Sequence, residues 1–372
     1  MKTPSRDHAV TGISLDYVLL GAIICLAALG LIMVLSASGI MAEKVWGDKY
    51  ALFWRQVSYT VVGLCVLFAT MRSSMDFFYR HTYFWIILAA ILLFATLFFA
   101  QAGGATRWLR LGPLSIQPLE AAKIALVLYL AYFFSNKQDK VKTFSVGFVP
   151  PIMMTGFLCF LLLLQPDFGG AMVLAALLFL LCLVGGTRII FLGSAIMLAV
   201  LSAVLLVANS PYRSKRLFAF LDPFKDAQNT GYQLVQSLYG LGSGGWFGLG
   251  LGEGRQKLFF LPEAHNDFIL SVVGEELGFF GLSLIFILLG VVLWRTISIS
   301  VRQESLRDRV TAFGMGAIIL IGGVLNAGVV LGALPPKGVP MPFISYGGSH
   351  LVAGYFCAGV LLNLSRKARG GI

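Results

Sequence analysis

The chain has 372 residues, of which 58% are hydrophobic and only 12% are charged, and its mean hydropathy is +0.85. A water-soluble domain of this length carries a larger share of charge, so the composition excludes a soluble protein and indicates a polytopic membrane protein. The net charge of +11 does not indicate nucleic-acid binding, because the basic residues form small clusters beside apolar segments rather than one continuous face.

Ten apolar segments close to bilayer length predict transmembrane helices over 15–38, 57–70, 83–100, 119–134, 146–164, 168–184, 189–208, 268–294, 310–334 and 351–364. Short polar joints connect most of them, so we expect a single all-α membrane domain over 1–372. One connection is long, at about 209–267, between the seventh and eighth helices. The first apolar run, over 15–35, has the length of a membrane span and is too long for the core of a signal peptide.

Lysine and arginine are distributed unevenly between the predicted loops. With the N-terminus inside, the cytoplasmic segments hold 15 of these residues and the short outer loops hold six. Because positive charge in short loops is biased toward the cytoplasm, we expect both termini inside and the 209–267 segment outside. No internal repeat of the kind found in many secondary transporters is visible, which disfavours transport. The five cysteines lie in apolar runs without paired spacing and predict free thiols.

The segment LPEAHNDFIL, at 261–270, places ionisable side chains directly before the eighth apolar run. Carboxylates at membrane depth are costly to desolvate, so their presence indicates a partner or a reaction. Glu263, His265 and Asp267 could hold a divalent ion, although the sequence offers no fourth protein ligand, and we expect no stable protein-built metal site.

Two further acids, Glu275 and Glu276, lie inside the eighth apolar run. Asp267, Ser271 and Glu275 follow at intervals of four, which places them on one face of a helix, with Glu275 about 12 Å deeper than Asp267. Gly274 and Gly278, four residues apart in the same run, would allow another helix to approach closely. The two glutamates are therefore either a functional polar stripe facing the bundle or ion-paired structural residues.

The stretch GGATRWLRLGPLSIQPLEAAKIAL, at 103–126, introduces Glu120 and Lys123 into an apolar span. Three residues apart on a helix, these side chains share a face. One interpretation is a structural ion pair near the membrane interface. The other is that Lys123, with Arg107 and Arg110 above it, binds an anion such as a lipid-linked pyrophosphate on the outer side.

Two glycine- and proline-rich segments fall outside the predicted helices. GLGSGGWFGLGLGEG, at 240–254, contains eight glycines, and its formal match to a dinucleotide fingerprint lacks the required strand and helix context. It is either a turn-rich loop or a backbone that approaches a phosphate-bearing ligand.

The prolines of PPKGVPMPF, at 335–343, predict a stiff outer loop or re-entrant segment. Asn326, in the ninth span, predicts an interhelical hydrogen bond.

Several motifs occur together in this order: SLDYVLL with LSAS, RW at 107–108, QPLEAAK, QPDFGG, GYQLVQSLYGLGSGG, LPEAHNDFILSVVGEELG and PPKGVPMPFISYGGS. In order and spacing they resemble the SEDS family of peptidoglycan glycosyltransferases over essentially the whole chain. The Lys337–Gly338 pair and LPEAHNDF resemble the cell-division (FtsW-like) branch more than the elongation (RodA-like) branch. The sequence departs from the family pattern at Leu119, Pro336 and His350.

The resemblance implies polymerisation of lipid II into lipid-linked glycan strands at the outer face of the bacterial inner membrane, at the division septum. A class B penicillin-binding protein would act as transpeptidase partner beside other divisome proteins. Asp267 matches the essential aspartate of the family and is the expected general base. We expect the substrate to contact the remaining polar motif residues, Arg107, Trp108, Glu120, Lys123, His265, Lys337 and Ser345.

The resemblance leaves two points of the reaction open. The departing pyrophosphate could be neutralised by Lys123, by Arg107 or by a bound divalent cation, Mg²⁺ or Mn²⁺. No other cofactor is expected, because the leaving group supplies the energy. The rival functions are a lipid II flippase or other transporter, an elongation-type polymerase, and a non-enzymatic division scaffold. A flippase requires a substrate path to both faces, whereas the polar motifs here map to the outer side.

Overall fold

The computed structural model describes residues 15–99, 107–111, 114–209, 214, 220–229 and 231–367. Its elements in chain order are α1 (Tyr17–Trp46), α2 (Ala51–Arg72), α3 (Met75–Arg80), α4 (Thr82–Thr96), β1 (Leu109–Leu111), β2 (Leu114–Ile116), α5 (Pro118–Asn136), η1 (Gln138–Lys140), η2 (Phe144–Phe148), α6 (Val149–Leu164), α7 (Phe168–Gly185), α8 (Ile189–Ala208), η3 (Pro223–Asp226), α10 (Tyr232–Ser243), η4 (Gln256–Phe260), α11 (Ile269–Val301), α12 (Leu306–Val330) and α13 (Gly348–Lys367).

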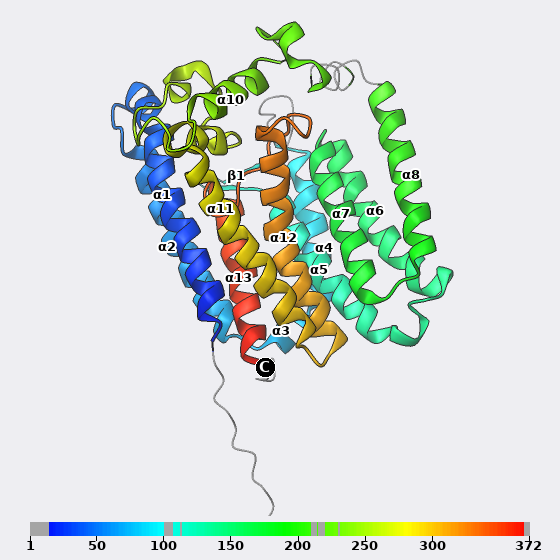
Figure 1. Cartoon of the computed structure of the whole chain (residues 1–372). Coiled ribbons are helices and arrows are strands. Elements are labelled where there is room, and N and C mark those ends of the chain that lie inside the picture. The colour runs from blue at the N-terminus through cyan, green and yellow to red at the C-terminus, as the bar shows by residue number, and fades with distance from the viewer. Residues whose placement is uncertain are drawn as a thin grey trace, which may run out of the picture.

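The described elements form a bundle of long helices that run in alternating directions (Figure 1). Within the described residues, eight helical stretches are long and apolar enough to cross a membrane, and α4 and α8 supply two shorter apolar ones. The predicted all-α membrane fold with about ten spans is therefore confirmed. The only strands among these elements are β1 and β2, which form a short antiparallel hairpin that periodicity did not reveal.

The helix boundaries differ from the apolar windows mainly at polar ends. The first helix continues past the predicted end at residue 38 to Trp46 and stops at Gly47, whose φ of 73° favours glycine. Its start is capped by Asp16, whose side chain accepts a hydrogen bond from the N–H of Leu19 at 3.0 Å. Helix α2 begins at Ala51, six residues before its predicted start. The helical backbone continues through Arg55 and Gln56, two polar residues that lie just before the apolar window.

The beginning of α1 and the end of α13 lie at the same end of the bundle, together with α3 (Figure 1). The β1–β2 hairpin and α10 lie toward the opposite end. We call the first of these the inner end and the second the outer end, after the orientation that the distribution of basic residues predicts.

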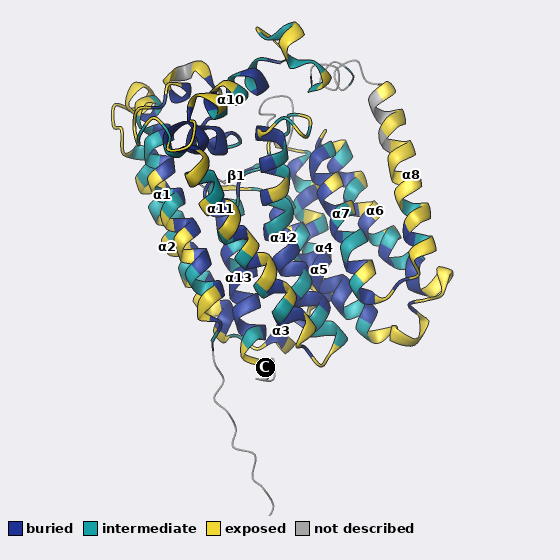
Figure 2. Ribbon diagram, viewed as in Figure 1, coloured by how far each residue is buried: buried dark blue, intermediate teal, exposed yellow. Residues whose placement is uncertain are grey.

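Burial separates the inside of the bundle from its lipid-facing side. Helices α5, α12 and α13 are largely buried, whereas α8 stands at the edge and is mostly exposed (Figure 2). Helix α13 packs closely on α2, and Asn363 on α13 donates hydrogen bonds to the carbonyls of Thr70 and Ser73 at 2.9 and 2.7 Å. Such a bond satisfies backbone oxygens at the end of α2 that have no helical partner.

The outer end of α11 is shaped by the glycine-rich segment. Helix α11 is interrupted at Gly278, where φ is 64° and ψ is −159°. A Cβ atom at Gly248 would collide with the backbone of Glu276, and one at Gly278 would collide with the backbone of the 246–248 turn. The glycines therefore allow two backbones to touch. Residues 240–243 form the end of α10, and the rest of the segment, from Gly244 to Gly254, is a turn-rich loop packed on α11.

The two buried glutamates of α11 hold this loop in place. Glu275 accepts hydrogen bonds from the N–H groups of Arg255 and Gln256 at 2.8 and 3.1 Å. Glu276 pairs with Lys257 at 2.7 Å and accepts from the Ser36 hydroxyl at 2.6 Å. Of the two predicted alternatives, these contacts favour the structural one.

Candidate active site

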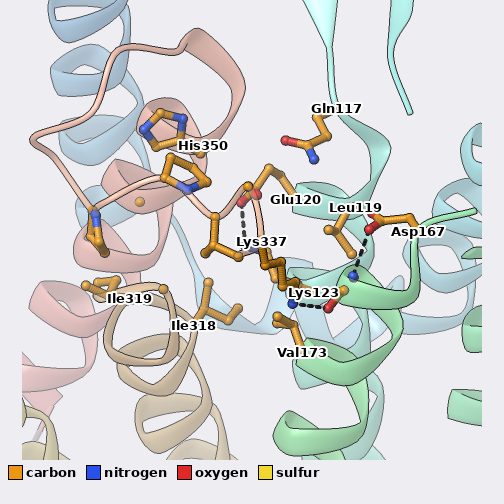
Figure 3. A pocket seen from close by; sticks show the side chains of 18 of the residues that line it. Gln117, Leu119, Glu120, Lys123, Asp167, Val173, Ile318, Ile319, Lys337 and His350 are labelled. Carbon is orange, nitrogen blue, oxygen red and sulfur yellow. Dashed lines mark hydrogen bonds and ion pairs between the residues drawn. The ribbon is translucent and has the colours of Figure 1, made fainter. Parts of the chain in front are cut away.

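A narrow, solvent-open cavity lies toward the outer end of the bundle, between α5, α7, α12, α13 and the 331–347 loop. Figure 3 shows its side chains, which come from segments more than 200 residues apart in the sequence. Its ionisable and amide side chains are Arg107, Gln117, Glu120, Lys123, Asp167, Lys337 and His350. Three cations of this group, Arg107, Lys123 and Lys337, face two acids, so the cavity is suited to an anionic ligand.

Glu120 and Lys123 form an ion pair of 2.8 Å on the first turns of α5, and both side chains line the cavity. Their side chains are only 10% and 13% exposed, respectively. The two interpretations offered by the sequence are therefore compatible, because the pair is a structural contact and also a wall of the cavity. Lys123 keeps further N–H donors, since an ammonium group has three.

Arg107 is held at the cavity by the start of α7. Its guanidinium donates to the carbonyl of Pro166 at 3.1 Å and lies 3.7 Å from the carboxylate of Asp167. Asp167 also caps α7 by accepting a hydrogen bond from the N–H of Gly170 at 3.0 Å. Asp167 was missed as a site residue, although an acid directly before the apolar run of QPDFGG was a usable signal.

Lys337 enters the cavity from the 331–347 loop and donates a hydrogen bond to the carbonyl of Gly169 on α7. Burial, with smaller contributions from the charges of Lys123 and Arg107, lowers the pKa of Lys337 to about 8, while the charge of Asp167 acts in the opposite direction. The ammonium group therefore lacks a full counter-charge. An anion bound between these cations would raise this pKa and be stabilised in return.

Asp267 lies directly behind Gly338, a glycine that lines the cavity. A Cβ atom on Gly338 would stand 2.7 Å from the carboxylate of Asp267, so only glycine leaves this carboxylate uncovered. Burial raises the pKa of Asp267 to about 6, with a contribution from the negative charge of Glu263, while Arg107 acts in the opposite direction. A carboxylate with this pKa is suited to accept a proton near neutral pH.

The loop that carries Asp267 is tied to the 331–347 loop by backbone contacts. The amide of Asn326 donates to the carbonyls of Asp267 and Val339, both at 2.7 Å. The hydroxyl of Ser345 donates to the carbonyl of Asn266 at 2.6 Å, and the N–H of Tyr346 donates to the carbonyl of His265 at 3.0 Å. Asn326 thus joins two loops rather than two helices, which corrects the prediction of an interhelical bond.

The structure brings together most of the predicted site residues. Arg107, Glu120, Lys123 and Lys337 line one cavity, with Asp267 beside it. Ser345 and His265 support the loops instead of lining the cavity, and Trp108 is also absent from its lining. Burial lowers the pKa of His265. The side chain of Arg110 lies outside the described residues.

Asp267 is not on the helical face that it was predicted to share. Helix α11 begins at Ile269, after Asp267. Ser271 donates to the carbonyl of Ser237 at 2.9 Å, and Glu275 binds the glycine-rich loop. The predicted polar stripe therefore divides into one candidate catalytic group, Asp267, and two groups that bind neighbouring segments: Ser271 binds α10 and Glu275 binds the glycine-rich loop.

No cluster of three or more metal-binding side chains occurs among the described residues. Glu263 and Asp267 are nevertheless close enough for the charge of one to raise the pKa of the other. Such a pair fits Mg²⁺ or Mn²⁺ in the way common at phosphate sites, where one or two carboxylates and the substrate phosphates share the ion.

Comparison with known proteins matches the chain over nearly its whole length. The model of the family described as "Cell cycle protein" (FtsW, RodA and SpoVE) matches residues 17–370. A Trichlorobacter lovleyi protein named "Probable peptidoglycan glycosyltransferase FtsW" is 42% identical over 353 residues, which cover 94% of this chain and 93% of the relative.

Two solved structures are similar along the same length. One is described as "Structural coordination of polymerization and crosslinking by a peptidoglycan synthase complex"; its TM-score is 0.77 and its identity 27%, with 95% of this chain and 98% of that chain covered. The crystal structure of Thermus thermophilus RodA has a TM-score of 0.70 and an identity of 27%, and the match covers 96% and 99% of the two chains. The expected SEDS resemblance is confirmed, and this chain belongs to the FtsW, RodA and SpoVE family of cell cycle proteins.

Proposed function

We propose that this chain is a peptidoglycan glycosyltransferase that polymerises lipid II into glycan strands at the outer face of the bacterial inner membrane. The observation that carries the proposal is the position of Asp267, a carboxylate with a pKa of about 6, beside a cavity lined by three cations. The names of its relatives, "Probable peptidoglycan glycosyltransferase FtsW", support the same reaction.

Asp267 acts as general base in this proposal. It accepts the proton of an acceptor sugar hydroxyl while the hydroxyl oxygen attacks the anomeric carbon of the donor. A new glycosidic bond forms, and the bond from that carbon to the polyprenyl pyrophosphate breaks, with its electron pair leaving on the pyrophosphate. The leaving group supplies the energy, so no nucleotide is consumed.

Lys337, Lys123 and Arg107 stabilise the negative charge that develops on the leaving pyrophosphate. Fixed cations in a partly dehydrated cavity favour this charge more strongly than mobile ions in water do. Lys337 has the most to gain, because burial and neighbouring cations hold its pKa down to about 8 before an anion arrives. Glu120 keeps Lys123 in place through their 2.8 Å contact.

A divalent cation would add further neutralisation at the same point. Asp267 and Glu263 would hold Mg²⁺ or Mn²⁺ jointly with the phosphates, and the ion would supply Lewis-acid stabilisation of the leaving group. An ion held by Asp267 would lower the pKa of this carboxylate, so coordination of a metal and acceptance of the proton are alternative roles for Asp267.

The chain acts at the division septum with a class B penicillin-binding protein and other divisome proteins. Identity of 42% to an FtsW-named relative, against 27% to the RodA structure, supports the division branch. The similar structure described as a peptidoglycan synthase complex that coordinates polymerisation and crosslinking supports a transpeptidase partner. Both termini are cytoplasmic in this proposal.

The decisive experiment is strand synthesis by the purified chain from purified lipid II, with and without the transpeptidase partner. A polymerase converts lipid II into glycan that a muramidase digests. A flippase moves labelled lipid II across vesicles without making glycan, and a scaffold does neither. Failure to make glycan in the presence of the partner, by a folded protein, would contradict the proposal.

A further inference from the structure

A second, more open cavity is lined by residues of α3, α5 and α12 and by His81, which precedes α4. Helix α3 lies at the inner end of the bundle (Figure 1). The cavity is far from the candidate active site in the fold, and the proposed reaction does not use it. Its lining combines two arginines, Arg80 and Arg307, with the hydroxyl of Ser74 and the aromatic rings of Phe77 and Tyr132.

Arg307 is fixed in this cavity before any ligand binds. Its guanidinium lies 4.0 Å from the centre of the Tyr79 ring and 3.3 Å from a carboxylate oxygen of Asp76. The hydroxyl of Tyr79 donates to Asp308 at 2.6 Å, so the ring on which Arg307 rests is anchored to α12. The guanidinium N–H groups of Arg307 that remain available are therefore already in position, which lowers the entropy cost of binding a ligand.

Arg80 contributes an uncompensated charge. It is exposed at the end of α3, and no carboxylate pairs with it within the described residues. Among the described residues Asp76 is the only acid in the lining, so the two arginines leave the lining with net positive charge. This balance favours an anion.

An apolar stripe leads away from the cavity along α4, which begins directly after the cavity residue His81. Residues spaced by three or four positions form one helical face, and four exposed apolar side chains have this spacing. These side chains, each between 51% and 58% exposed, are Phe84, Ile87, Ile91 and Phe94. Phe77, at the cavity itself, is 53% exposed. In a membrane such a stripe contacts acyl chains.

We propose that this cavity binds the phosphate of an anionic phospholipid from the inner leaflet of the membrane. Arg80 and Arg307 contact the phosphate, Phe77 packs against the glycerol region, and one acyl chain follows the stripe on α4. Basic pockets between helices on the cytoplasmic side are suited to lipid headgroups of this kind. Inorganic phosphate shares the headgroup chemistry, but it would leave the adjoining stripe without a role. The inference is independent of the proposed reaction.

Native mass spectrometry of the full chain, released from a neutral detergent, tests the site by counting bound phosphatidylglycerol and phosphatidylcholine at equal concentrations. We expect wild-type protein to prefer phosphatidylglycerol. Arg80→Glu should weaken the first bound phosphatidylglycerol by roughly 25-fold, because a basic residue near an anionic lipid surface contributes about a factor of five and the change from +1 to −1 applies that factor twice.

The matched control is Arg302→Glu, which makes the same charge change at an exposed position at the inner end of α11, outside the cavity. It should bind phosphatidylglycerol as wild type does. Equal loss in both variants, or no loss in Arg80→Glu, would overturn the proposal. Displacement of phosphatidylglycerol by millimolar inorganic phosphate would also overturn it, because the acyl chain would then contribute nothing.

Thermal unfolding in detergent gives a second readout that does not depend on ionisation in the spectrometer. A ligand that binds only the folded state raises Tm. Phosphatidylglycerol should raise Tm of wild type and Arg302→Glu more than phosphatidylcholine does, and this difference should be absent in Arg80→Glu. The same difference persisting in Arg80→Glu would count against the site.

Discussion

Asp267 illustrates at the residue scale how one carboxylate is prepared for chemistry by its neighbours. Burial and the charge of Glu263 raise its pKa to about 6, while Arg107 keeps it from rising further. Gly338, which lines the cavity, has no side chain that would cover the carboxylate. The group is therefore largely ionised at neutral pH yet basic enough to accept a proton.

Asp267→Asn should abolish glycan polymerisation while lipid II binding is retained. Asparagine keeps the size of aspartate but cannot accept a proton at neutral pH, and loss of a general base costs about 10² to 10⁴ in rate. Gel analysis of glycan made from labelled lipid II measures the rate, and fluorescence binding measures affinity.

Two controls separate a base from a metal ligand: the Asp267→Glu variant, and a titration of the variants with Mg²⁺ or Mn²⁺. Recovery of Asp267→Asn activity by added metal would indicate that Asp267 coordinates a metal ion instead of accepting a proton. Near wild-type synthesis by Asp267→Asn would rule out the base.

The rate of polymerisation should depend on pH as a bell-shaped curve. Asp267 must be deprotonated, so activity rises as pH increases through about 6. Lys337 must be protonated, so activity falls as pH increases through about 8. Initial rates of lipid II consumption at subsaturating substrate, between pH 5 and 9.5, report these two groups in the free enzyme.

Lys337→Arg provides the matched variant for the alkaline limb. Arginine stays charged throughout this range, so the fall above pH 8 should disappear even if the rate at neutral pH is lower. An unchanged alkaline limb in Lys337→Arg would mean that another group titrates there.

Lys123→Ala should lose most activity without unfolding, because its proposed task is to bind the pyrophosphate. Glu120→Ala should cost less activity, since Glu120 only positions the lysine. Glycan synthesis and Tm are measured for both single variants and the double variant. If Lys123→Ala lowers Tm and the double variant recovers both Tm and synthesis, the 2.8 Å contact would be structural only.

The sequence predicted the chemical character of the site better than its exact membership. Arg107, Lys123 and Asp267 were predicted because charges beside or inside apolar runs require a reason, whereas Lys337 was predicted from the family resemblance. Asp167 and His350 were missed as site residues: the acid before the apolar run of QPDFGG was a signal for Asp167, but the place of His350 in the cavity depends on contacts between distant segments. The supporting role of Ser345 depends on a contact to Asn266, 79 residues away, that no local pattern contains.

At the element scale, the outer end of α11 and the glycine-rich segment behave as one folded unit. Glu275 and Glu276 bind backbone or side-chain donors about 20 residues earlier in the chain. The sequence predicted that these acids needed partners, but the partners of Glu275 are N–H groups of Arg255 and Gln256, which composition cannot indicate.

The long helices were predictable from the sequence, because in a membrane an apolar run of bilayer length satisfies its backbone hydrogen bonds best as a helix. The β1–β2 hairpin and α10 were not, because short elements in loops depend on tertiary contacts.

Glu275→Ala should destabilise the protein by about 1–3 kcal/mol, because it leaves the buried N–H group of Gln256 and the partly buried one of Arg255 without an acceptor. Thermal unfolding in detergent measures the effect. Glu253→Ala is the matched control, since Glu253 is exposed in the same segment. We expect its Tm to equal that of wild type. Equal Tm values for all three proteins would show that the loop contributes nothing to stability.

At the scale of the whole molecule, two helices connect the two cavities. Helix α5 carries Glu120 and Lys123 at its outer end and Tyr132 near its inner end, and α12 carries Arg307 near its start and Asn326 near its end. The proposed reaction site and the proposed phospholipid site therefore lie at opposite ends of shared, largely buried helices. Both proposals depend on which end of the bundle faces the cytoplasm.

Cysteine accessibility determines this orientation. In a chain whose five natural cysteines are replaced, single cysteines at the exposed positions Lys49 and Gln228 should react with a membrane-impermeant maleimide on intact spheroplasts. Cysteines at the exposed positions Lys142 and Arg302 should react only after permeabilisation, because basic residues concentrate at that end.

Glycan synthesis by the cysteine-free chain is the control that the fold survives the replacements. The opposite labelling pattern would place the cavity beside Asp267 on the cytoplasmic side, where growing glycan strands could not join the cell wall. Polymerisation at the outer face would then be untenable for this chain, and the basic cavity around Arg80 would face the outer leaflet instead. Labelling on the predicted sides would put the three cations and Asp267 at the outer surface, as the reaction requires.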